Sequence, residues 1–282
     1  MRTLVTGGAG FVGSNLVDRL IEKGHDVTIL DNLLTGKKEN INPKAKWINM
    51  DVRDSLEDLE KVDVIFHLAA LARIQPSFKN PAESFDINLG GTVNICEFAR
   101  KSGARIVYAG SSSFYAGPYL NPYSFTKWQS EEVCKMYSEV YDLPTAIARF
   151  FNVYGYRQTF EGAYATVVGI FERQYRDNEP LTITDDGEQR RDFTHVDDIV
   201  SGLIKMSEDD NWRGEIFNLG TGKNHSINEL ASLYNHQTTY IPKRPGEARI
   251  TLADLSFSKE KLNYEPSKTL ENYVKNWLEE NK

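Results

Sequence analysis

Tyr123 and Lys127 are four residues apart, a spacing at which they could together carry out acid–base chemistry. Residues at this spacing near the start of a helix lie on one face, so the phenol and the ammonium point the same way. The pKa of a phenol is normally about 10, and a nearby positive charge favours its ionised form. Tyr123 is therefore a candidate general base near neutral pH, supported by Lys127.

Three serines, Ser111, Ser112 and Ser113, follow a predicted strand shortly before this pair. A serine hydroxyl there could hydrogen-bond the substrate oxygen that gains or loses a proton, although a serine-rich turn gives the same pattern. A Y-x-x-x-K spacing also arises by chance in a chain with 14 tyrosines. This pair is distinguished by its position after a strand whose carboxyl end faces the ligand crevice of a parallel α/β sheet.

Gly7, Gly10 and Gly13 form a G-x-x-G-x-x-G pattern within the sequence TGGAGFVG. Between a strand and a helix, such glycines let the backbone approach a pyrophosphate, which the free N–H groups of the helix N-terminus attract. Asp31 closes the next predicted strand, where a carboxylate accepts hydrogen bonds from the adenosine ribose and repels a 2′-phosphate. The pattern predicts an NAD site rather than an NADP site.

The elements that must position these residues alternate between short apolar strands and amphipathic helices up to about residue 150. This alternation predicts an α/β fold with a doubly wound parallel sheet covered on both faces, a Rossmann fold. We expect strands over 2–6, 26–30, 46–50, 62–67, 105–109 and 144–149, and helices over 11–23, 82–101 and 122–141.

The pattern loosens after residue 149 and indicates a smaller mixed region. We expect a loop over 155–162, helices over 164–177, 195–206, 227–234 and 270–279, and strands over 180–184 and 215–218. We expect the NAD-binding domain to comprise residues 1–150 and about 190–218, and the substrate-binding region about 151–189 and 219–282.

The composition is ordinary for a globular protein and carries a net charge of −7, which gives no basic footprint for nucleic acid. No apolar run approaches the roughly 20 residues that span a bilayer, and the first residues lack a signal-peptide core, so we expect neither a membrane nor a targeting segment. Cys96 and Cys134 are expected to be buried free thiols, without a metal. We expect a cytoplasmic protein.

Taken in order, a series of motifs resembles the extended short-chain dehydrogenase/reductases of the NAD-dependent epimerase/dehydratase family, most closely the UDP-glucose 4-epimerase group. The similarity covers nearly the whole chain. Its motifs are TGGAGFVG (6–13), HLAA (67–70), NLGGTVN (88–94), YSFTK (123–127), RFFNVYG (149–155), GEQRRDFTHVDDIV (187–200), FNLGTG (217–222) and RPGEARITLADLS (244–256).

The resemblance implies roles for the matching residues. It implies that Tyr123 and Lys127, with Ser111 or Ser112, catalyse the reaction. It implies NAD contacts from Gly7, Gly10, Phe11, Val12, Gly13, Asp31, Asn32, Asp51, Val52, Leu68, Ala69, Ala70, Asn88, Tyr123, Lys127 and Phe150. It implies substrate contacts from Ser111, Tyr123, Asn152, Arg191, Arg244 and Glu247. Of these, Asn152 and the arginines match residues that hold the UDP diphosphate, and Glu247 matches a residue near the uridine ribose.

The chain departs from the family pattern between Ser111 and Tyr123, where only 11 residues intervene and the family has a longer loop beside the sugar. The shortening predicts a more open sugar pocket or a different closure. Alignment on Tyr108 makes Ser111 the catalytic hydroxyl, and alignment on Gly117 makes it Ser112; we favour Ser111. Related 4,6-dehydratases carry an Asp-Glu pair after the hydroxyl residue, where this chain has serines.

We expect NAD-dependent C4 epimerisation of a UDP-sugar through a transient 4-keto sugar, with UDP-glucose and UDP-galactose as the first pair. UDP-glucuronate 4-epimerases, which belong to the same family, are an alternative. UDP-N-acetylglucosamine is another, because the resemblance places Thr251 beside the sugar and its side chain is small enough for an N-acetyl group. A UDP-sugar dehydratase, decarboxylase or reductase is a second hypothesis, and a non-catalytic NAD-sensing module is a third. The resemblance also implies a homodimer formed through the two long helices.

Overall fold

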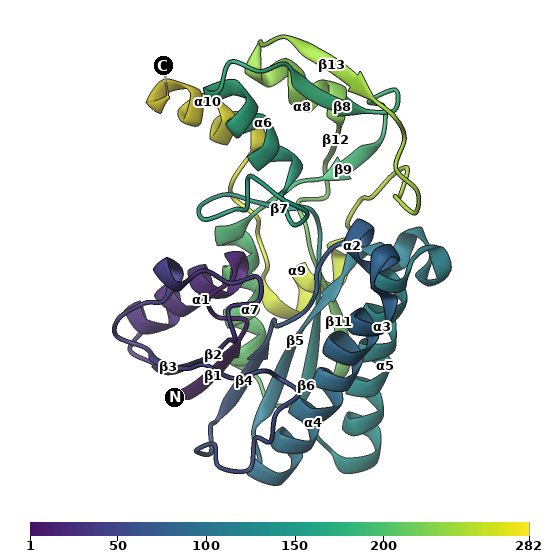
Figure 1. Cartoon of the computed structure of the whole chain (residues 1–282). Helices are drawn as coiled ribbons and strands as arrows, with labels where there is room; N and C mark the ends of the chain where they lie inside the picture. Colours follow the sequence, from purple (N-terminus) through teal and green to yellow (C-terminus); the bar gives the residue numbers. More distant parts are fainter. Residues whose placement is uncertain (282) are drawn as a thin grey trace.

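A seven-stranded parallel sheet forms the base of the molecule, as the sequence predicts (Figure 1). The computed structural model describes residues 1–281. The strand order is β11-β6-β5-β4-β1-β2-β3, so the chain reverses direction across the sheet between β1 and β4. The strands are β1 (Arg2–Thr6), β2 (Asp26–Leu30), β3 (Lys46–Ile48), β4 (Val64–His67), β5 (Arg105–Ser111), β6 (Thr145–Phe150) and β11 (Arg213–Leu219).

Helices cover both faces of this sheet because alternate strand residues point to opposite faces. One apolar cluster joins the sheet to α1 (Phe11–Glu22) and α7 (Val196–Ser207). A second joins it to α4 (Gly91–Ser102) and α5 (Pro122–Tyr141). Both faces are therefore buried, which explains the nearly continuous apolar sequence of the central strands.

The remaining elements pack above the carboxyl edge of the sheet around a third apolar cluster (Figure 1). This part contains short two-stranded sheets, in which β10 pairs with β7, β12 with β9, and β13 with β8. Its elements are β7 (Val153–Tyr154), α6 (Val167–Arg176), β8 (Leu181–Thr184), β9 (Arg190–Asp192), β10 (Thr194–His195), β12 (Asn224–Ser226), α8 (Ile227–Tyr234), β13 (Thr238–Ile241) and α10 (Leu270–Glu280). Helix α9 (Ser256–Leu262) instead packs against β11 and α7, beside the large sheet. Since β11 pairs with β6 in the large sheet, the chain crosses between the two parts more than once. The division into two domains stays a proposal.

Several elements differ from the predicted ranges. The predicted helix over 82–101 is composite, with α3 (Pro81–Phe85) and α4 separated by a π-helical turn, Asp86–Gly90. Strand β5 continues to Ser111, beyond the predicted end at residue 109. Helices α2 (Ile74–Lys79) and α9 were not predicted, because they are short and a proline interrupts the first.

Two further predictions concern membranes and thiols. Within residues 1–281, no helix combines the length and apolar character needed to cross a bilayer. Cys96 and Cys134 are free and buried, as predicted. They lie on α4 and α5, within the cluster that covers one face of the sheet.

Candidate active site

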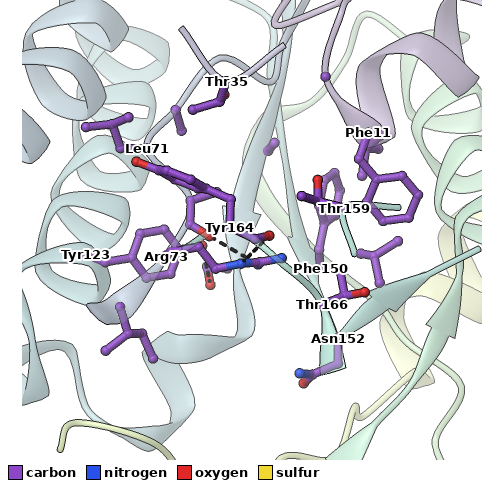
Figure 2. A pocket seen from close by; sticks show the side chains of 18 of the residues that line it. Phe11, Thr35, Leu71, Arg73, Tyr123, Phe150, Asn152, Thr159, Tyr164 and Thr166 are labelled. Atoms are coloured by element: carbon purple, nitrogen blue, oxygen red, sulfur yellow. Dashed lines mark hydrogen bonds between the residues drawn. The ribbon is translucent and has the colours of Figure 1, made fainter. Parts of the chain in front are cut away.

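One cavity of about 520 Å³ extends from the glycine-rich turn to the segment around residues 244–251. Figure 2 shows part of its lining, with Phe11, Tyr123 and Asn152 among the labelled side chains. It lies at the carboxyl edge of the sheet, where the strand order reverses and where open α/β sheets bind ligands. Its walls bring together the predicted residues Gly7, Gly10, Phe11, Val12, Gly13, Asp31, Asn32, Asp51, Val52, Leu68, Ala69, Ala70, Ser111, Ser112, Tyr123, Lys127, Phe150, Asn152, Arg191, Arg244 and Glu247.

Asn88 is the predicted site residue that is not part of this cavity wall. Its amide is buried and bonds to the loop after β4, accepting from the N–H of Leu71 at 2.7 Å and donating to the carbonyl of Leu71 at 3.3 Å. It also donates to the hydroxyl of Thr126 on α5 at 3.0 Å. Asn88 therefore supports the cavity wall at Leu71 from behind.

The turn between β1 and α1 requires glycine because of close backbone approaches. Gly7 has φ +70°, and a Cβ on it would lie 2.9 Å from the backbone nitrogen of Ala69. A Cβ on Gly13 would lie 2.1 Å from the carbonyl oxygen of Gly7. No side chain caps α1, so its first N–H groups are free to bind an anion in the cavity.

Asp31 lies at the end of β2 and is largely buried. Its carboxylate accepts from the N–H of Ala9 at 2.9 Å and from the N–H of Leu33 at 2.8 Å. These bonds fix the carboxylate next to the glycine-rich turn. Next to it, Asn32 donates to Asp51 at 2.8 Å, so the two predicted contacts at this end of the cavity are bonded together.

Tyr123 and Ser111 meet in the wall of the cavity. Helix α5 begins with Pro122, and Asn121 caps it by accepting from the N–H of Ser124 at 2.7 Å, which fixes Tyr123 in the first turn. The Tyr123 hydroxyl donates to Ser111 Oγ at 3.2 Å. Ser112 also lines the cavity, but the hydroxyl that meets Tyr123 belongs to Ser111, the serine favoured from the sequence.

Lys127 lines the same cavity one turn further along α5. Its ammonium lies 4.3 Å from the centre of the Tyr108 ring. Burial lowers the pKa of Lys127 to about 8, and the negative charge of Glu131 opposes that shift. The lysine is therefore mostly charged at neutral pH and close to its titration point.

The far end of the cavity is lined by the residues predicted to bind the diphosphate and ribose. Arg191, on β9, is held by its Nη1, which donates to the carbonyl of Arg190 at 3.0 Å, while Nη2 lies 3.8 Å from a carboxylate oxygen of Glu247. Arg244 and Asn152 also line the cavity. Three segments far apart in sequence thus contribute two guanidinium groups and an amide to its wall.

Comparisons with known proteins agree with this architecture. The family model described as NAD dependent epimerase/dehydratase family matches residues 3–220. The chain belongs to the NAD-dependent epimerase/dehydratase family. A provisionally named UDP-glucose 4-epimerase of Methanocaldococcus jannaschii is 40% identical over 306 residues, covering 99% of this chain and 98% of that protein.

Two solved structures extend the family comparison. The UDP-glucose 4-epimerase of Thermotoga maritima, solved with UDP-glucose, superposes with a TM-score of 0.93 at 34% identity, covering 99% of this chain and 98% of that one. The UDP-glucuronic acid 4-epimerase of Bacillus cereus, solved with UDP-glucuronic acid and NAD, superposes with a TM-score of 0.91 at 28% identity, covering 99% of both chains.

NAD is the cofactor of this family, and the residues present fit it. A side chain at Gly7 or Gly13 would collide with backbone, so the turn leaves room for a close pyrophosphate approach beside the uncapped α1. The carboxylate of Asp31 lines the cavity beyond that turn, where an adenosine ribose would lie.

Arg73 is a cavity residue of this family member that sequence reasoning missed. It reaches across the cavity, where Nε donates to the carbonyl of Tyr164 at 2.9 Å, and Figure 2 shows it beside Tyr123. Burial raises the pKa of Tyr123, while the hydrogen bond to Ser111 and the charge of Arg73 oppose that rise. Arg73 thus adds a positive charge beside Tyr123 that the sequence analysis did not include. Its sequence signal was a lone charge in the apolar stretch after β4.

Proposed function

We propose that the chain is a UDP-sugar 4-epimerase that interconverts UDP-glucose and UDP-galactose. The arrangement that carries the proposal is the bonded pair Tyr123 and Ser111, in one cavity with a nucleotide-binding turn at one end and Arg191 and Arg244 at the other. Names of similar proteins support the same reaction class. Arginine suits the diphosphate end because its planar fork donates to phosphate oxygens in pairs.

In the proposed reaction, Tyr123 as phenolate accepts the proton of the sugar 4-hydroxyl, while Ser111 donates a hydrogen bond to the same oxygen. NAD, when bound, would supply the reversible hydride acceptor that this oxidation and reduction at C4 need. Between the two half-reactions the 4-keto sugar would turn over in the cavity, so that C4 is restored with the opposite configuration. Tyr123 then gives its proton back to the oxygen, so the cycle has no net redox change.

The test is incubation of the purified protein with UDP-glucose, UDP-N-acetylglucosamine and UDP-glucuronate in separate reactions, followed by NMR of the C4 stereochemistry. We expect UDP-galactose from UDP-glucose without added cofactor and without net NADH. Stoichiometric NADH consumption would instead indicate a reductase, and loss of water or carbon dioxide a dehydratase or decarboxylase. Binding of NAD with no conversion of any UDP-sugar would indicate a sensing module.

We also propose a homodimer formed through α4 and α5. Apolar side chains are exposed on these two helices, among them Val93, Met136, Val140 and Tyr141. Val140 lies near the C-terminal end of the 20-residue helix α5, and its exposed fraction is 63%. Pairing of the two long helices with those of a second copy would bury these side chains in a four-helix bundle.

A further inference from the structure

A buried ion pair lies directly behind the candidate catalytic residues. Arg149, on β6, donates from Nη2 to Glu131 Oε2 at 2.6 Å and from Nε to the same oxygen at 3.1 Å. The side chains are 5% and 1% exposed, respectively. Glu131 lies one turn beyond Lys127 on α5, so Tyr123, Lys127 and Glu131 follow one another along one face of the helix.

Stability alone does not explain why a buried ion pair is present at this position. Removing two charges from water costs about as much free energy as their attraction returns, so a buried pair adds little net stability compared with well-packed apolar residues. The pair does, however, impose a fixed geometry on whatever it contacts. Three of its contacts lead to the active site.

The first contact is with the backbone of Ser111. Glu131 Oε1 accepts from the N–H of Ser111 at 3.4 Å. Gly110 permits this approach, because a Cβ on it would lie 2.6 Å from the same oxygen. The carboxylate therefore holds the strand end from which the Ser111 hydroxyl meets Tyr123.

The second contact is with the shortened loop after Ser111. The guanidinium of Arg149 lies 3.8 Å from the ring centre of Phe114 and 5.0 Å from that of Tyr115. The hydroxyl of Tyr115 donates to Asn218 on β11 at 2.8 Å. The loop that is short in this chain is thus anchored on the ion pair by two aromatic rings.

The third contact is electrostatic and concerns Lys127. The negative charge of Glu131 raises the pKa of Lys127 against the effect of burial, and the Cys134 thiol acts in the same direction. The Tyr108 ring on β5 and the His67 ring on β4 also face the ammonium. Burial and the positive charge of Lys127 lower the pKa of His67 to about 3. Among these neighbours of Lys127, Glu131 is the one with a carboxylate.

We propose that Glu131 and Arg149 are positioning residues for the catalytic centre, which fix Ser111 and the short loop behind it and keep a negative charge one turn from Lys127. The inference rests on the proposed function, because it assumes that Ser111, Tyr123 and Lys127 act on the sugar. Neither residue lines the cavity, so their effect on catalysis runs through the residues that they hold.

The test compares Glu131→Gln with Glu132→Gln in the NAD-containing enzyme. Glu132 is the next residue, is partly exposed and pairs with Lys135 at 2.8 Å. For Glu131→Gln we expect kcat to fall by about 10- to 100-fold, the usual effect of slightly misplaced reacting groups, with KM and NAD content nearly unchanged. We also expect the alkaline limb of the kcat profile to move to lower pH, because Lys127 loses a stabilising negative charge.

Arg149→Gln provides the opposite electrostatic change. It removes the positive partner and leaves Glu131 charged, so kcat falls while the alkaline limb does not move to lower pH. If either single variant fails to fold, the double variant Glu131→Gln/Arg149→Gln leaves no unpaired buried charge and is expected to fold. It should show the kcat loss and the acidward shift of Glu131→Gln.

A folded Glu131→Gln or double variant with wild-type kcat and a wild-type pH profile would overturn the proposal. A loss of kcat without any displacement of the alkaline limb would overturn its electrostatic part and leave a packing effect. Wild-type enzyme and Glu132→Gln must both convert the sugar. If neither enzyme converts the sugar, the proposed function is wrong, and that failure is distinct from a failure of the ion-pair proposal.

Discussion

The ammonium of Lys127 lies 4.3 Å from the ring centre of Tyr108, within the wall of the cavity that also contains Tyr123. The ring face attracts the cation, but a ring cannot replace the water that the ammonium has lost. The pKa of Lys127 therefore falls to about 8. This position makes the charge state of the active site sensitive to moderately alkaline pH.

The pH dependence of kcat should follow from this lysine. Its positive charge is mostly present at pH 7, is half lost at about pH 8 and disappears as the pH rises further. Because the proposed base needs a nearby cation, we expect kcat to fall above about pH 8. The measurement is kcat for UDP-glucose from pH 6 to 10, with NAD content checked at each point; a profile that stays flat to pH 10 would contradict it.

Replacement of Tyr123 by Phe removes the proposed base and keeps the ring. We expect kcat to fall by at least about 100-fold, the typical contribution of general acid–base catalysis. NAD should still co-purify with the protein, because the glycine-rich turn is untouched. Tyr119→Phe is a suitable control, since Tyr119 is exposed and lies outside the cavity wall. A Tyr123→Phe enzyme with wild-type turnover would exclude Tyr123 as the base.

Asp31 should determine the preference for NAD over NADP. A like-charge contact near about 4 Å costs roughly 1–4 kcal/mol, so Asp31→Asn should improve NADP binding relative to NAD by at least about 5-fold. Asparagine keeps an oxygen that can accept from the N–H of Ala9, which limits damage to the turn. Titration of both nucleotides into cofactor-free protein measures the ratio, and an unchanged ratio would mean that Asp31 does not read the ribose.

Arg244 should contribute to substrate affinity through the diphosphate. A hydrogen bond to a charged group is worth about 1.5–3 kcal/mol, so Arg244→Ala should raise KM by about 10- to 150-fold with a smaller effect on kcat. Arg249→Ala is the matched control, because Arg249 lies on the same segment and pairs with Asp186 at 2.8 Å. Equal KM values for the two variants would remove Arg244 from the diphosphate site.

The surface of α4 and α5 predicts the oligomeric state. We expect the wild-type protein to elute as a dimer in size-exclusion chromatography with light scattering. Val140→Glu places a charge on the exposed helix face and should give monomers, because an unpaired charge is costly inside an interface. Glu139→Gln, at the neighbouring position, should stay dimeric. A monomeric wild-type protein would contradict the proposed interface.

The sequence by itself determined the elements whose signals are local. The glycines of the first turn, the alternation of apolar strands and amphipathic helices, and the proline and asparagine that begin α5 all act within a few residues. These signals gave the order of the strands along the chain and the place of Tyr123 in the first turn of its helix. The parallel sheet follows from them, since its strands need crossover helices.

Only the tertiary structure decided which side chains reach one another. It turned Asn88 away from the cavity toward Leu71, selected Ser111 as the hydroxyl that meets Tyr123, and brought Arg73 across to Tyr164. These contacts join segments separated by up to 91 positions, and periodicity within one element does not encode them. Which way these side chains point depends on how the helices and loops pack over the edge of the sheet. Their burial and the charges around them exist only once segments distant in sequence have come together.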